Sequence, residues 1–239
     1  MLRQQLDRVR ERIQQACQRC GRPASSVTLV SVTKGVAVDG IREAVALGLT
    51  DLGENRVQEA RAKQAILGSR TPPVRWHLIG HLQRNKARHA VELFDVVHSV
   101  DSLDLIEKLE KATSRKLLAV SQGAAPETTQ WLDVFVQVNI SGEMTKHGCR
   151  PENVQALARR ILCSQHLKLR GLMTIAPFVE DQEEARPHFR NMRMLRDDLV
   201  RACSLQPAAC SLSMGMSQDF EVAIEEGADF VRIGTAIFG

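Results

Sequence analysis

The sequence predicts an α/β fold: a single (β/α)₈ barrel of the TIM type with an extra helix at its N-terminus. Short β-branched segments alternate strictly with amphipathic helical segments along the chain. We count eight strand-like segments, the strand number of this barrel. The length of 239 residues, 44% hydrophobic and 25% charged, suits one large barrel or two small domains, and the unbroken alternation favours the single barrel. We therefore expect residues 1–239 to form one domain.

The chain opens with a charged amphipathic helix that precedes the alternation. Its apolar residues recur at helical spacing at Leu2, Leu6, Val9 and Ile13. Only about one helical turn follows Gly234. We therefore expect this first helix either to cover the bottom of the barrel or to take the place of the eighth helix.

The remaining elements follow in order. Short apolar runs predict strands at residues 26–34, 49–53, 74–80, 95–100, 131–140, 167–175, 210–215 and 228–234. Helical periodicity predicts helices at residues 38–48, 54–67, 82–94, 103–113, 151–162, 183–203 and 218–227. Residues 121–130 have the composition of a loop, and we expect a connection there because the alternation resumes at once. A doubly wound open sheet is the alternative, but no G-x-G-x-x-G follows the first strand.

Composition argues against several classes of protein. The net charge of +4 is spread along helices, and no basic run interleaves with aromatic residues, so we expect no nucleic-acid partner. No stretch approaches the roughly 18 apolar residues of a membrane span. The N-terminal segment lacks the apolar core of a signal peptide, and six cysteines do not make a dense disulfide scaffold. We therefore expect a cytoplasmic protein.

Metal binding is a further alternative that the sequence does not favour. Cys17 and Cys20 form a C-x-x-C, but no second cysteine pair has ligand spacing, and both extend the apolar stripe of the first helix. The seven histidines form no H-x-H or H-E-x-x-H pair. His77 and His98 lie near strand ends and are the two candidates that a metal-dependent barrel hydrolase would use. We expect no metal.

The last nine residues, "VRIGTAIFG", predict an anion site. A strand ends at Gly234 and one helical turn begins at Thr235, which leaves backbone N–H groups pointing at one spot. Phosphate sites in this barrel favour the loops after strands seven and eight, here "GMSQD" and "GTAIF". Ser217 begins the seventh helix as its N-cap, and its hydroxyl can also donate to a phosphate.

Lys34 ends the first strand and would face this anion site across the barrel mouth. A desolvated lysine loses its proton more readily and can form a Schiff base with a carbonyl. A phosphate-bearing aldehyde, either pyridoxal 5′-phosphate (PLP) or a sugar phosphate, would satisfy both ends. Arg232 would meet the far edge of a bound ring and, facing a pyridine nitrogen, would keep that nitrogen unprotonated. A carboxylate at that position makes the stronger electron sink.

Eight motifs carry a resemblance to a known family. They are "VSVTKGV", "GENRVQEA", "WHLIGHLQRNK", "HSVDS", "VQVNIS", "RGLMTI", "LSMGMSQDFEVAI" and "VRIGTAIFG". In this order they resemble the pyridoxal phosphate homeostasis proteins, the YggS/PROSC family, over nearly the whole chain. That family is in turn similar to the barrel domain of bacterial alanine racemases and eukaryotic ornithine decarboxylases.

The resemblance implies a role for each site residue. Lys34 would carry PLP as an aldimine, and Arg232 would face the pyridine nitrogen. Ser217, Gly234 and Thr235 would hold the phosphate. Asn55 and the segment 77–86 would line the ring side of the pocket, with Met214 near the ring. Family members often read "SKTKP" where this chain has "TKGV". The missing second Lys and Pro put in doubt a lysine relay next to Lys34, but not the attachment itself.

Two functions remain open. The first is a binding protein in vitamin B6 and amino-acid homeostasis, which holds PLP and passes it to PLP-dependent apoenzymes. The alternative is a PLP-dependent amino-acid racemase or decarboxylase. The related racemases use a Tyr from a separate β-domain as second base, and this chain has neither that domain nor any Tyr. We therefore expect no catalytic residue, no turnover and a monomer.

Overall fold

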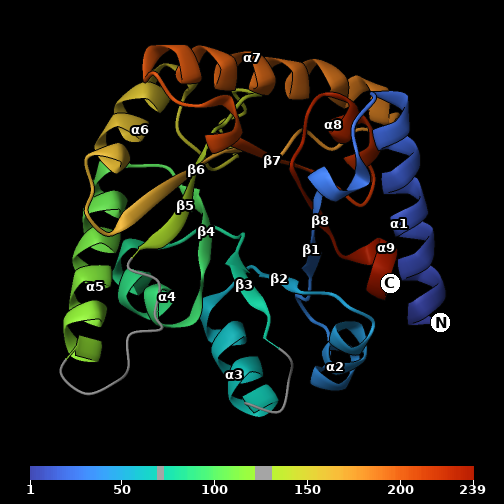
Figure 1. Cartoon of the computed structure of the whole chain (residues 1–239), viewed down its shortest axis with the longest axis horizontal. Coiled ribbons are helices and arrows are strands. Elements are labelled where there is room, and N and C mark those ends of the chain that lie inside the picture. The colour runs from blue at the N-terminus through green and yellow to red at the C-terminus, as the bar shows by residue number, and fades with distance from the viewer. Residues whose placement is uncertain (69–72, 122–130) are drawn as a thin grey trace.

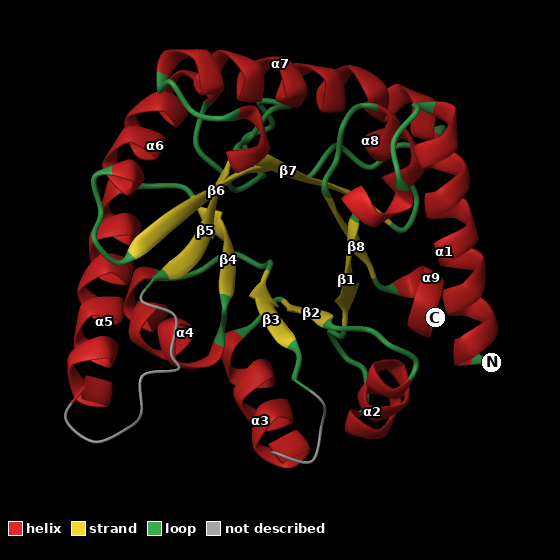
Figure 2. Cartoon of the chain, viewed as in Figure 1, coloured by secondary structure: helices red, strands yellow, loops and turns green. Residues whose placement is uncertain are grey.

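Eight parallel strands close into a barrel in the computed structural model, which describes residues 1–68, 73–121 and 131–239 (Figure 2). Each strand pairs with the next, and β8 pairs with β1. The strands are β1 Thr28–Val32, β2 Asp51–Glu54, β3 Arg75–Leu78, β4 Val96–Val100, β5 Leu132–Gln137, β6 Leu167–Met173, β7 Ser211–Met216 and β8 Phe230–Ile233. The predicted (β/α)₈ barrel is confirmed, and the doubly wound sheet is excluded.

Helices surround this barrel as an outer layer (Figure 1). They are α1 Leu2–Arg19, α2 Val38–Ala46, α3 Val57–Leu67, α4 Ala87–Leu93, α5 Leu103–Ser121, α6 Val154–Leu162, α7 Arg186–Ala202, α8 Phe220–Glu225 and α9 Thr235–Phe238. The helix expected at 103–113 continues to Ser121. The loop expected at 121–130 otherwise lies outside the described residues. Parallel strands are joined by crossover connections, so after each strand the chain runs through the outer layer of helices before the next strand begins.

Two apolar layers result from the alternation of side chains along each strand. One set of side chains packs between strands and helices and forms the larger core. The other set points into the barrel, where Val30, Ile79, Val96, Phe135, Met173 and Phe230 form a smaller cluster. Polar side chains share this interior, and they become important at the site.

The first helix, α1, takes the place of an eighth barrel helix and does not cover the barrel bottom. It packs beside α8 and α9, and the two chain ends lie close together (Figure 1). Gln5 Nε2 donates a hydrogen bond to the carbonyl oxygen of Gly239 at 2.7 Å. Cys17 is buried on its apolar face and Cys20 is partly buried, as expected for core cysteines. In the described ranges, no helix combines the length and apolarity needed to cross a membrane.

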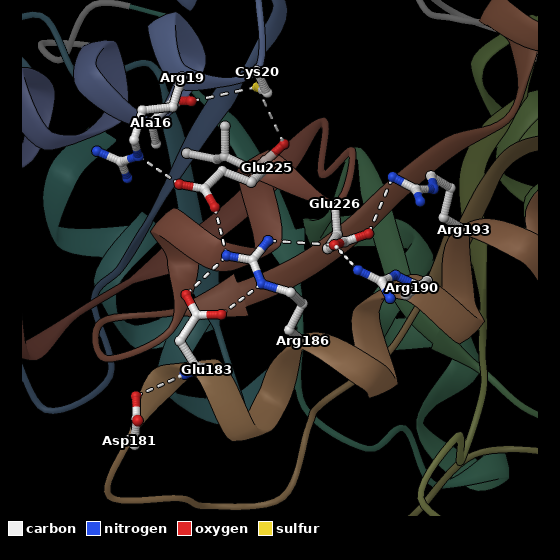
Figure 3. A network of polar contacts seen from close by, with 11 residues as sticks. Ala16, Arg19, Cys20, Asp181, Glu183, Arg186, Arg190, Arg193, Glu225 and Glu226 are labelled. Carbon is white, nitrogen blue, oxygen red and sulfur yellow. Dashed lines mark hydrogen bonds and ion pairs between the residues drawn. The ribbon is translucent and has the colours of Figure 1, made fainter.

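A polar network ties α1, α7 and α8 together on the outside of the barrel (Figure 3). The Glu225 carboxylate accepts hydrogen bonds from Arg19 Nε and Arg186 Nη2, each at 2.6 Å. Burial alone would raise the pKa of Glu225, but the bonds from the two arginines outweigh it and lower the pKa. Arg190 and Arg193 form ion pairs with the neighbouring Glu226. Carboxylates shared between helices in this way fix α1 against the repeat it completes.

Candidate functional site

A cavity of about 1150 Å³ opens at the carboxyl ends of the strands. This is the end at which barrels of this type carry their sites, because the loops after the strands converge there. Six of the seven residues that the sequence analysis singled out line it: Lys34, Asn55, Ser217, Arg232, Gly234 and Thr235. The structure therefore brings together residues that lie up to 201 positions apart.

Lys34 occupies a tight turn immediately after β1. The Val36 N–H donates to the carbonyl oxygen of Thr33 at 2.9 Å, and Gly35 has a φ of 73°, which favours glycine. Val32 faces the barrel interior, and Lys34 continues the same alternation. The Lys34 side chain is exposed and has no hydrogen bond or ion pair within the described ranges. Its amine is therefore free to meet a ligand in the cavity.

The loops after β7 and β8 meet at Ser217. Its hydroxyl oxygen accepts hydrogen bonds from the N–H groups of Gly234 at 3.3 Å and Ala236 at 3.4 Å. The N-cap of α8 is Asp219, so the expectation that Ser217 caps that helix is corrected. A Cβ at Gly234 would lie 3.2 Å from Val32 Cβ, so a glycine suits this close packing. Hydroxyl and N–H donors thus gather at one end of the cavity.

Arg232 lies on β8 and is 3% exposed, with its guanidinium at the floor of the cavity. Nη1 donates to Ser213 Oγ and Nη2 to the carbonyl oxygen of Thr174, each at 2.7 Å. Burial lowers the pKa of Arg232 to about 10, and the nearby Asp219 carboxylate partly offsets this. The guanidinium therefore stays protonated at neutral pH and is held in one orientation.

A chain of hydrogen bonds continues from Arg232 through the barrel interior. Ser213 Oγ lies 2.9 Å from His98 Nδ1, and His98 Nε2 lies 2.9 Å from His77 Nδ1. His77 Nε2 lies 2.9 Å from Asp51 Oδ1. Burial lowers the pKa of both histidines, well below the usual value for His98. We call these five residues, Asp51, His77, His98, Ser213 and Arg232, the interior relay.

The interior relay has a single direction. The Asp51 carboxylate accepts only, so His77 Nε2 carries the proton and His77 Nδ1 accepts from His98 Nε2. His98 Nδ1 then accepts from Ser213, which itself accepts from Arg232. Both histidines are candidate metal ligands by their positions near strand ends in the sequence. Among the described residues, no group of three or more His, Cys, Asp or Glu side chains is placed to hold a metal ion.

Asn55 lies directly after β2 and also lines the cavity. Gly80 packs on its backbone so closely that a Cβ there would lie 2.3 Å from the carbonyl oxygen of Asn55. The His81 ring, which also lines the cavity, stacks on His147 with 4.0 Å between the ring centroids. Ile79, Gly80 and His81 are therefore the part of segment 77–86 that lines the cavity.

The structure does not bring Met214 to the cavity. Its side chain is fully buried in the larger core between strands and helices. Ser213 points into the barrel, and successive side chains of a strand point to opposite faces, so Met214 faces the helices. The strand register shifts between Ser213 and Met216, and Met216, at the end of β7, lines the cavity instead.

Gln137, at the end of β5, lines the cavity but was missed by the sequence analysis. It is 5% exposed, and its Nε2 donates to the carbonyl oxygen of His147 at 3.2 Å. Its Oε1 is buried and has no hydrogen-bond partner in the part of the chain that the structure describes. A buried polar atom of this kind is costly to leave unpaired, so it suits a ligand that brings a hydrogen-bond donor. Together with the free amine and the N–H donors, the cavity fits a phosphorylated aldehyde with a polar ring.

Comparison with known proteins agrees with this geometry. The family model described as "Alanine racemase, N-terminal domain" matches residues 4–239. The pyridoxal phosphate homeostasis protein of Aquifex aeolicus is 42% identical over 236 residues, covering 99% of this chain and 96% of its own. The structure of PipY from Synechococcus elongatus PCC7942 with PLP bound has a TM-score of 0.81 and 34% identity, covering 100% of both chains.

Alanine racemase of Clostridium difficile 630 shares the fold alone. It has a TM-score of 0.71 at 16% identity and covers 100% of this chain and 56% of its own. The sequence similarity thus lies with the homeostasis proteins and PipY, while the racemase is a distant relative in architecture.

Proposed function

Because the chain belongs to the pyridoxal phosphate homeostasis proteins, which share the alanine racemase N-terminal domain, we propose that it binds PLP in this cavity and serves PLP homeostasis without turning over amino acids. The observation that carries the proposal is that one cavity holds both the anion donors around Ser217 and the Lys34 amine, which has no partner among the residues that the structure describes. PipY, whose structure holds PLP, covers the whole of this chain and supports the same cofactor.

Five of the six predicted residues that line the cavity have a proposed part. When bound, the cofactor supplies an aldehyde that condenses with a primary amine and releases one water molecule. Lys34 provides that amine. The hydroxyls of Ser217 and Thr235 and the N–H groups that begin at Gly234 bind the phosphate, since charge-assisted hydrogen bonds are the strong ones. Arg232 donates to the pyridine nitrogen. Met214 has no part in this assignment because it lies outside the cavity.

The absence of turnover rests on two features. Arg232, whose pKa burial lowers only to about 10, stays a donor and leaves the pyridine nitrogen unprotonated. That weakens the electron sink on which most reactions of this cofactor depend. The 239 residues contain no Tyr to act as the second base of a racemase. Both features favour a carrier over the racemase or decarboxylase alternative.

The wider setting is part of the same proposal. We infer one barrel domain over residues 1–239, which the family match over residues 4–239 supports. We place the protein in the cytoplasm, consistent with cysteines that are free throughout the described residues. We further infer that it acts as a monomer and passes PLP to apoenzymes that require it.

Borohydride trapping tests the proposal. The protein is incubated with PLP, reduced, digested and mapped by mass spectrometry, and the pyridoxyl group is expected on Lys34. Lys34→Ala should remove the label and keep the fold, because the phosphate donors lie elsewhere. Lys146→Ala is the matched control, since this second lysine of the cavity already donates to the carbonyl oxygen of Ala176. A label on another residue with Lys34 unmodified contradicts the proposal.

A further inference from the structure

We propose that Glu54, Glu59 and Lys63 are positioning residues that hold the turn carrying Lys34 so that its amine points into the cavity. This inference rests on the proposed function, because it assigns a role relative to the attachment at Lys34. None of the three lines the cavity, and none was singled out in the sequence analysis. With Thr33 they form one group of hydrogen bonds behind the turn, which we call the Lys63 cluster.

Lys63 is the centre of the Lys63 cluster. Its Nζ donates to the carbonyl oxygen of Thr33 at 2.5 Å and to Glu54 Oε1 and Glu59 Oε1 at 2.7 Å each. An ammonium group has three N–H donors, so all of them are used. Lys63 is 7% exposed although it lies on α3, a helix whose solvent face would normally carry a lysine. The side chain is therefore turned inward toward the chain segment that follows β1.

The Lys63 cluster grips the backbone on both sides of Lys34. On one side, Thr33 Oγ1 donates to Glu54 Oε1 at 2.5 Å, and the Thr33 carbonyl oxygen accepts from Lys63. On the other side, the Gly35 N–H donates to Glu59 Oε1 at 2.7 Å. The side chain of Lys34 between them has no such partner within the described ranges. The turn is thus fixed by its two neighbours while the amine stays free.

Burial of this much charge needs a reason beyond stability. Glu54 is fully buried, and this burial raises its pKa, although the bonds from Lys63 and Thr33 oppose the rise. Replacing a buried ion pair with apolar side chains often leaves stability unchanged or increases it. Such a pair is therefore weak grounds for a stabilising role. Directional bonds to one turn are what apolar packing would not supply, and that turn carries Lys34.

The Lys63 cluster also makes the two neighbouring lysines, Lys34 and Lys63, differ in reactivity toward an aldehyde. Lys63 is enclosed by two carboxylates and a carbonyl oxygen, so its nitrogen lone pair is unavailable to an aldehyde. Lys34 has no comparable partner in the described ranges and is exposed at the cavity. Of these two neighbouring lysines, only Lys34 therefore presents a reactive amine to the cavity, and the unreactive Lys63 helps to hold it in place.

The test separates attachment from binding. PLP is mixed with each variant, and the rate of covalent attachment is followed by absorbance. Affinity for pyridoxine 5′-phosphate, which has an alcohol in place of the aldehyde, is measured in parallel. Glu59→Ala should slow attachment about tenfold or more, since small misplacements of a reacting group are costly, with pyridoxine 5′-phosphate affinity changed less than twofold. Glu59→Gln, which keeps an oxygen acceptor for Gly35, should recover most of the rate.

Gln58→Ala is the matched control, because Gln58 is exposed on the same helix one residue away, and it should behave as wild type. Gly35→Ala is the second test if Glu59→Ala does not fold. A Cβ at Gly35 meets no atom within 4 Å, but the φ of 73° strains it, so attachment should also slow. Unchanged attachment in both variants, or equal losses for PLP and pyridoxine 5′-phosphate, overturns the inference. Failure of the proposed function is distinct, because wild type itself would then carry no label on Lys34.

Discussion

Inside the barrel, Arg232 Nη1 on β8 donates a hydrogen bond of 2.7 Å to Ser213 Oγ on the neighbouring strand β7. This single contact joins the floor of the cavity to the interior relay. Through Ser213 the guanidinium reaches His98 and His77, and the relay ends at the Asp51 carboxylate at the start of β2. The interior relay therefore has the positive Arg232 at one end, the negative Asp51 at the other and neutral side chains between them. It holds Arg232 in one orientation before any ligand enters.

Removing that shared hydroxyl should lower both the free energy of unfolding and the affinity of the cavity for PLP. In Ser213→Ala, Arg232 Nη1 and His98 Nδ1 lose their common partner while buried. We expect a loss of about 2 kcal/mol in the free energy of unfolding, measured by urea denaturation. Because the guanidinium then keeps a single hydrogen bond to the described residues, the one to the Thr174 carbonyl oxygen, PLP affinity should fall about tenfold, the equivalent of about 1.4 kcal/mol.

Ser211→Ala is the control for this change, since Ser211 begins the same strand and its hydroxyl has no hydrogen bond among the described residues. We expect it to stay within about 0.5 kcal/mol of wild type. If Ser213→Ala matched Ser211→Ala in both measurements, the interior relay would have no part in holding Arg232.

Mild acid should destabilise the protein through its buried histidines. Burial lowers the pKa of His77 and His98 in the folded state, so below pH about 6.5 the unfolded chain binds protons that the folded chain does not. The free energy of unfolding should then fall by about 1.4 kcal/mol per pH unit for each histidine. Urea denaturation from pH 7.5 to pH 5 measures the slope.

The buried carboxylates affect the free energy of unfolding at lower pH than the histidines do. The pKa of Asp51 is lowered by its hydrogen bonds despite burial, so its stabilisation is lost only as pH falls below the ordinary value of about 4. Burial raises the pKa of Glu54 and Asp219, so these two carboxylates have the opposite effect: their contribution to the free energy of unfolding rises as pH falls.

A free energy of unfolding that is constant from pH 7.5 down to pH 5 would contradict the histidine prediction, because it would show that His77 and His98 are not buried as neutral rings.

Loss of the phosphate should cost most of the affinity. Several donors meet around Ser217, and charge-assisted hydrogen bonds are worth roughly 1.5–3 kcal/mol each. Pyridoxal without its phosphate should therefore bind at least about 10³-fold more weakly than PLP, as measured by fluorescence titration. In Ser217→Ala the ratio of PLP affinity to pyridoxal affinity should fall about tenfold. Ser25 is exposed, so Ser25→Ala should leave that ratio unchanged. Equal affinities for PLP and pyridoxal would exclude a dedicated phosphate site.

Amino acids should not be turned over by the loaded protein. A missing general acid–base group alone typically costs 10²–10⁴-fold in rate, and the chain has no Tyr. The holo protein is incubated with each common L- and D-amino acid, and racemisation, decarboxylation and transamination are followed. Turnover above about 1 s⁻¹, the low end for enzymes, on any of them would put the racemase or decarboxylase alternative first. Transfer of PLP to an apoenzyme without turnover is the expected outcome.

The sequence by itself was enough to predict the barrel and the location of its site. Strand and helix periodicities are local properties, and strict alternation leaves few topologies for a chain of this length. Parallel strands place all their carboxyl ends on one face. For that reason Lys34, Ser217, Arg232, Gly234 and Thr235, each at or near a strand end, could be assigned to one cavity before any contact was known.

Only the tertiary structure decided which side chains touch. His98 and Ser213 meet across 115 positions of the chain, and Lys63 reaches the Thr33 carbonyl oxygen across 30. The interior relay leaves no local pattern, because its bonds form between strands that come together when the barrel closes. In the Lys63 cluster only the Glu59–Lys63 pair is local, four residues apart on α3. Met214 and Ser213 differ by one residue, yet strand register turns one toward the helices and the other toward Arg232. Periodicity determines the elements, whereas the closed barrel determines which buried polar groups find a partner.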